Sequence, residues 1–67
     1  MILDKPLTQV ERRNYIDMLE GCKNRICVTD DVGELFILLG SAVYQLNILA
    51  QSRYLELKER EVDESIS

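Results

Sequence analysis

The pattern of apolar and polar residues is uneven along this chain, and its densest apolar run covers residues 35–50. Twelve of the sixteen residues in that run are apolar. A typical surface helix carries an apolar stripe on one face, whereas this run is apolar nearly all round. One partner helix from the same short chain cannot cover such a segment. The run therefore predicts self-association or burial against another protein.

A first helix is predicted from a start signal at Thr8 and from the spacing of the apolar residues that follow. Thr8 and Glu11 match a capping box, in which each side chain accepts a hydrogen bond from the other residue's backbone N–H. The later apolar positions are spaced by three and four residues, which is a helical period. These positions are Tyr15, Leu19, Cys22 and Ile26. We expect a lead-in over residues 1–7 and a first helix over residues 8–28.

Gly21 leaves an alternative open inside the first helix. Glycine within a helix costs about 1 kcal/mol relative to alanine. It either marks a close crossing with another helix or ends the helix early, in which case residues 25–29 are extended. A single short strand without a visible partner is an unusual structure, so we expect the helix to continue through Gly21.

A turn over residues 29–31 is expected to lead into a longer second helix over residues 32–61. Asp31 and Glu34 match a second capping box, and the acidic turn suits the positive end of the helix dipole. A helix of that length would extend roughly 45 Å at 1.5 Å per residue. The short acidic tail over residues 62–67 is expected to fray.

These elements predict an all-α fold, a single domain over residues 1–67 in which two helices form an antiparallel hairpin. We expect one face of the second helix to pack on the first: Val32, Leu35, Leu39, Ala42, Leu46, Leu49 and Leu57. Four apolar side chains would remain partly or wholly uncovered: Ile37, Leu38, Tyr44 and Ile48. Monomeric soluble proteins avoid large exposed apolar patches. A two-fold dimer that forms a four-helix bundle is the simplest way to bury them.

The predicted dimer or partner interface therefore lies on the second helix. Its core is expected at Phe36, Leu39, Val43, Leu46 and Ala50, and its other members are Ile37, Gly40, Tyr44 and Ile48. Gly33, Gly40 and Asn47 recur every seven residues, which indicates either a close helix contact or chance. Gln45 and Asn47 either hydrogen-bond across an interface, as a buried Asn does in coiled coils, or mark a solvated edge.

Composition supports oligomerisation as the source of stability. A chain of 67 residues is near the lower size limit for independent folding. Such small domains compensate with disulfides, metals or association. Cys22 and Cys27 have neither a zinc-ligand nor a redox-motif spacing, and histidine is absent. We interpret the two cysteines as reduced thiols in a cytosolic protein, with an intermolecular disulfide as the alternative.

The sequence contains no recognisable catalytic, cofactor-binding or metal-binding motif. A histidine base is absent, and so is a glycine-rich phosphate loop, and neither cysteine has a visible base beside it. The acids of the turn are explained by helix capping. We therefore expect no enzymatic activity, no cofactor and no metal.

Charge and the N-terminus limit the partners. The net charge of −4 argues against general binding to nucleic acid, although Arg12 and Arg13 are candidate contacts on the first helix. Residues 1–5 do not resemble a signal peptide, and residues 35–50 are shorter than a membrane span. We expect a cytoplasmic, homodimeric regulatory or adaptor module that binds a protein and not a membrane. The alternatives are an RNA- or DNA-binding regulator and a small structural subunit of a larger complex.

Overall fold

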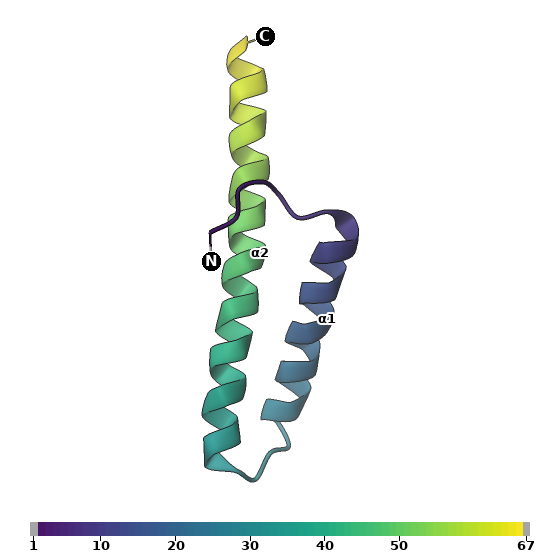
Figure 1. Cartoon of the computed structure of the whole chain (residues 1–67), viewed down its shortest axis with the longest axis vertical. Helices are drawn as coiled ribbons and strands as arrows, with labels where there is room; N and C mark the ends of the chain where they lie inside the picture. The colour runs from purple at the N-terminus through teal and green to yellow at the C-terminus, as the bar shows by residue number, and fades with distance from the viewer. Residues whose placement is uncertain (1, 67) are drawn as a thin grey trace.

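Two helices form an antiparallel hairpin in the computed structural model, which describes the backbone of residues 2–66 and the side chains of residues 2–60 (Figure 1). Helix α1 spans Gln9–Ile26 and helix α2 spans Val32–Ile66. The described residues contain no strand, so the predicted all-α hairpin is confirmed. The association of two hairpins into a bundle remains a prediction.

Helix α1 begins and ends through the expected kinds of local contact. The backbone N–H of Glu11 donates to Thr8 Oγ1 at 3.1 Å, and that of Thr8 donates to Glu11 Oε1 at 3.0 Å, so the capping box is confirmed. The helix stops at Ile26, earlier than residue 28, where the backbone N–H of Val28 bonds to Arg25 O three residues back and tightens the last turn. Basic side chains in the last turn suit the negative end of the helix dipole.

The helix continues through Gly21, and no neighbour explains the glycine. A Cβ atom built there meets no other atom within 4 Å, and no glycine in the chain has a positive φ. The idea that Gly21 marks a close helix crossing is therefore wrong for the single hairpin.

Gly21→Ala is consequently expected to stabilise the fold by about 1 kcal/mol, because alanine restricts the unfolded chain more than glycine does. That gain corresponds to a rise in Tm of about 4–8 °C for a domain of this size. Thermal unfolding followed by circular dichroism measures it. Gly33→Ala is the control with a smaller expected gain, because its Cβ would lie 3.3 Å from Asp31 Oδ1 at the helix cap. Equal gains would contradict the open environment of Gly21.

Helix α2 starts as predicted, but only half of its expected capping box forms. Asp31 Oδ1 accepts from the backbone N–H of Gly33 at 2.8 Å and of Glu34 at 3.3 Å. The Glu34 carboxylate does not return to Asp31, because it is engaged by the guanidinium of Arg25. Thr29 Oγ1 accepts from the Asp31 N–H in its place.

The far end of α2 lies beyond the expected one. The helix reaches Ile66 and not residue 61, since neither Gly nor Pro follows Gly40 in the chain. The side chains of the acidic tail over residues 62–67 lie outside the described residues. Because α2 has 35 residues and α1 has 18, the end of α2 extends well past the start of α1 (Figure 1). The result is a rod about 55 Å long and 18 by 16 Å across.

The inward face of α1 agrees with the prediction, whereas that of α2 agrees only in part. Tyr15, Leu19, Cys22 and Ile26 are all partly buried. On α2 the covered positions include Glu34, Leu38, Ser41, Gln45 and Ile48. Each precedes a residue expected to pack there. Of the expected residues only Ala42 and Leu49 are partly buried, so α2 is rotated from the predicted orientation by less than the roughly 100° that separates neighbouring residues. A helix that is apolar nearly all round carries little information about which side faces inward.

The N-terminal segment, residues 2–7, lies across α2 and is bonded to its polar face (Figure 1). The backbone N–H of Leu3 donates to Gln51 Oε1 at 2.8 Å, and that of Leu7 donates to Ser52 Oγ at 2.9 Å. Ser52 is only 2% exposed. These contacts favour the observed rotation, because they require the polar side of α2 to point toward the start of the chain.

Candidate interaction surface

A stripe of apolar side chains runs along α2 and remains exposed in the hairpin. Its members are Val32, Phe36, Leu39, Val43, Leu46, Ala50 and Leu57, and we call them the α2 stripe. Their spacing alternates between four and three residues, with Arg53 at the one position that interrupts it. This is the seven-residue pattern by which two helices pack in a coiled coil. Phe36 is 65% exposed and Val43 is 55% exposed.

The stripe lies on the side of α2 opposite α1. In a seven-residue repeat, the position farthest from the packing seam is occupied here by Ser41, Ile48 and Leu55. Those residues are buried or partly buried in the hairpin. Helix α1 therefore leaves the whole α2 stripe accessible to a second helix.

The total exposed surface is large for the mass of the chain. The chain exposes 5301 Å², whereas a compact monomer of 7.8 kDa exposes about 4,400 Å². The excess of about 900 Å² is close to the roughly 800 Å² that each partner buries in a standard protein interface. The rod shape accounts for some of this excess exposed area. The α2 stripe is the part of the exposed area that a partner can cover.

Most of the predicted interface residues lie on the α2 stripe or beside it. Phe36, Leu39, Val43 and Leu46 belong to the α2 stripe. Residues beside the stripe that are also exposed are Ile37, Gly40 and Tyr44. Whether any of them contacts a partner stays a prediction.

Ile48 requires a correction, because it is 0% exposed within the single hairpin. It packs in the contact between α1 and α2, so no partner can reach it while the hairpin is closed. A charge at this position would disrupt the hairpin itself and would not report on dimerisation. Leu38, which was expected to be partly or wholly uncovered, is partly buried.

A polar cluster occupies the contact between the helices. Gln45 is 5% exposed, and its Nε2 donates to Ser41 Oγ at 3.1 Å. Cys22 Sγ lies 3.6 Å from Ser41 Oγ and 3.7 Å from Gln45 Oε1. No buried side-chain N or O atom among the described residues lacks a hydrogen-bond partner. Gln45 is therefore part of the hairpin interior and not a solvated edge, whereas Asn47 is exposed.

The cysteines form no disulfide, and the carboxylates form no cluster for a metal ion, in the described part of the chain. Both cysteines are free; Cys22 is half-buried in the polar cluster, and Cys27 is exposed at the end of α1. No group of three potential metal ligands occurs among the described residues.

The ionisable groups with altered pKa values belong to helix ends. The hydrogen bond from Arg25 lowers the pKa of Glu34 below its ordinary value of 4.5, and the same contact raises the pKa of Arg25. Hydrogen bonds from the backbone and side chain of Thr8 lower the pKa of Glu11. These shifts have structural causes, namely the capping of α1 and the closure of the turn.

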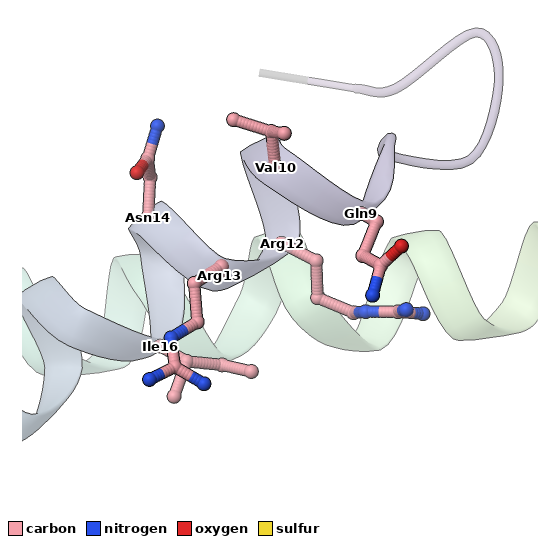
Figure 2. Close-up of a pocket in the computed structure, with 6 residues that line it drawn as sticks. All are labelled: Gln9, Val10, Arg12, Arg13, Asn14 and Ile16. Atoms are coloured by element: carbon pink, nitrogen blue, oxygen red, sulfur yellow. The ribbon is translucent and has the colours of Figure 1, made fainter.

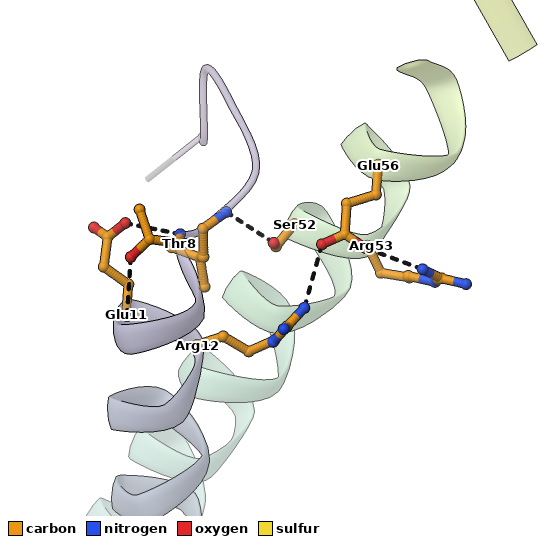
Figure 3. A network of polar contacts seen from close by, with 7 residues as sticks. Thr8, Glu11, Arg12, Ser52, Arg53 and Glu56 are labelled. Carbon is orange, nitrogen blue, oxygen red and sulfur yellow. Dashed lines mark hydrogen bonds and ion pairs between the residues drawn. The ribbon is translucent and has the colours of Figure 1, made fainter. Parts of the chain in front are cut away.

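The two candidate nucleic-acid contacts both have acidic partners. Arg12 Nη1 lies 3.4 Å from Glu56 Oε1, and Arg13 Nε lies 3.5 Å from Asp17 Oδ1. Glu56 also contacts Arg53 at 3.0 Å, beside the capping box and the Leu7–Ser52 bond (Figure 3). Arg12 thus links α1 to α2. A shallow surface depression here is lined by α1 alone, through Gln9, Val10, Arg12, Arg13, Asn14 and Ile16 (Figure 2).

Helix α2 also has the length and apolar composition of a membrane span. Its Val32–Arg60 portion is long and apolar enough, by length and composition, to cross a membrane. The expectation against a span considered only residues 35–50, which is less than the observed helix. Core helices of soluble proteins and signal sequences pass the same test, so this property does not by itself place the chain in a membrane.

Comparison with known proteins identifies no relative. No protein-family model, no curated protein and no solved structure matches the chain. The function must therefore be inferred from the hairpin and its exposed surface.

Proposed function

We propose that this chain is a non-enzymatic protein-interaction module that works as a homodimeric helical bundle, with the α2 stripe as the contact between two copies. The observation that carries the proposal is an apolar seven-residue repeat that stays exposed after the hairpin has formed. Regulatory or adaptor activity would then use the outer faces of the dimer, because the stripe is covered by association.

The energetics support association. Complete burial of one large apolar side chain contributes about 1.5–3 kcal/mol. Phe36, Leu39, Val43 and Leu46 are each about half exposed, so their burial contributes roughly 3–6 kcal/mol per copy before entropy costs. That is a substantial part of the 5–15 kcal/mol by which a small domain is stable.

The direct test is the solution mass of the native chain, measured by sedimentation equilibrium in reducing buffer over a dilution series. We expect twice the chain mass of 7.8 kDa, persisting to low micromolar concentration. Persistence in that range corresponds to about −8 kcal/mol of association. Reducing conditions exclude a dimer held only by a disulfide through exposed Cys27.

A second candidate function uses the same surface differently. If the chain is a small structural subunit, the α2 stripe would be covered by a larger protein, and the isolated chain would be a monomer or an aggregate. A mass of one chain at every concentration would contradict the homodimer and favour this alternative. Nothing in the geometry favours nucleic-acid binding, since Arg12 and Arg13 both contact carboxylates.

A further inference from the structure

We propose that the second copy lies antiparallel to the first along the α2 stripe, with the two-fold axis between Val43 and Leu46. This inference rests on the proposed homodimer and goes beyond it by fixing orientation and register. It is argued from the positions along the stripe, from Arg53 and from the charges at its two ends.

The proposed register pairs every position of the stripe. In an antiparallel dimer about this axis, each residue of one copy faces a residue of the other copy. The two residues of such a pair lie equally far from the axis along the sequence, one before it and one after it. The resulting pairs are Val43 with Leu46, Leu39 with Ala50, Phe36 with Arg53, and Val32 with Leu57. A shift by one repeat in either direction leaves residues at one end of the stripe without a partner. Large and small side chains also alternate across the seam, since Leu39 faces Ala50.

Arg53 distinguishes the two orientations. In a parallel dimer it would face its own counterpart near the end of an apolar seam, where two like charges repel each other. In the antiparallel register it lies beside Phe36, whose ring is widely exposed in the hairpin. An arginine over an aromatic ring is a favourable contact. The ion pair between Arg53 and Glu56 leaves the guanidinium on α2 near this position.

The charges at the two ends of the stripe favour the same orientation. Residues 29–34 contain three acids and no base, and Arg25 contacts only one of them, Glu34. In the antiparallel register these residues face residues 55–60 of the other copy, which contain two bases and two acids. A parallel dimer would bring the two acidic turns together. The antiparallel dimer keeps the two acidic turns apart and sets each beside a segment of the other copy that contains both bases and acids.

Site-specific cross-linking tests the orientation. Both native cysteines are first replaced, as Cys22→Ser and Cys27→Ser, and single cysteines are then introduced as Leu39→Cys in one preparation and Ala50→Cys in another. A short bismaleimide is added to each preparation and to their mixture, and mass spectrometry identifies the products. We expect an efficient cross-link between the two variants in the mixture and little product from either alone. In the antiparallel register the two copies of residue 39 are about 16 Å apart along the seam.

The possible outcomes separate this inference from the proposed function. Efficient self-cross-linking of Leu39→Cys would show a parallel dimer and overturn the orientation, while the homodimer would stand. Sedimentation at the mass of one chain, with no cross-link, would overturn both. A second pair, Val32→Cys with Leu57→Cys, lies at the ends of the stripe, where substitution disturbs the seam least. It must give the same mixed product if the proposed register is correct.

Discussion

Ile48→Ala is expected to destabilise the hairpin by about 2–5 kcal/mol, the usual cost of removing a fully buried aliphatic side chain. Ile48 is 0% exposed and lies in the middle of the contact between α1 and α2. A domain of this size has little stability in reserve, so the variant is expected to be largely unfolded near room temperature. Urea denaturation followed by far-ultraviolet circular dichroism measures the loss.

Ile37→Ala is the matched control, because it makes the same change on the same helix at a side chain that is 74% exposed. Its expected effect on the single hairpin is within about 0.5 kcal/mol, and the two variants are compared at a dilution where the dimer has dissociated, because Ile37 also lies beside the α2 stripe. If Ile48→Ala were no more costly than Ile37→Ala, α2 would face α1 through a different side. The comparison therefore tests the rotation of α2 directly, at the residue where the sequence pattern and the structure disagree.

Val43→Asp is expected to weaken the dimer by more than 100-fold while the hairpin stays folded. The substitution buries an unpaired charge next to the proposed two-fold axis, which costs about 3–5 kcal/mol. That cost corresponds to a factor of about 100 or more in Kd, at 1.4 kcal/mol for each factor of ten. The hairpin should survive, because the Val43 side chain is 55% exposed in the single chain. Sedimentation equilibrium reports the mass, and circular dichroism reports the helix content.

Val10→Asp provides the control for that experiment. It is the same substitution at an exposed position on the outer side of α1, away from the α2 stripe. We expect it to leave the dimer intact. A dimer that survives Val43→Asp with unchanged affinity would exclude the α2 stripe as the contact, whereas equal weakening by Val10→Asp would mean that charge alone drives dissociation.

Local signals predicted the helices and the turn well. Thr8 and Glu11 form the capping box that their spacing indicated, and Asp31 caps α2. Tyr15 and Ile26 lie on the predicted inward face of α1, because polar residues on its other sides leave one clear apolar stripe. Such features depend on neighbours within about one helical turn, so a short stretch of sequence determines them.

The orientation of α2 could not be predicted in the same way. Leu35, Leu39 and Leu46 were expected to face α1 because they are the larger apolar residues on one side. The structure instead covers Ser41, Gln45 and similar positions, which pack close to α1 and satisfy their polar groups there. The bonds from the N-terminal segment to Gln51 and Ser52 join residues more than forty positions apart. Contacts between residues so far apart in the sequence cannot be predicted from the local spacing of apolar residues.

The sequence by itself determined the hairpin, its caps and the excess of apolar surface on the second helix, because these follow from local hydrogen bonding and from the number of apolar residues. The tertiary structure alone decided which part of that surface remains open. The side of α2 that carries both polar and apolar residues faces inward. Polar contacts hold it there, above all those of Gln45, of Ser52 and of the Arg12–Glu56 pair. The apolar repeat of the α2 stripe is left facing outward, and Ile48 is placed in the interior of the hairpin.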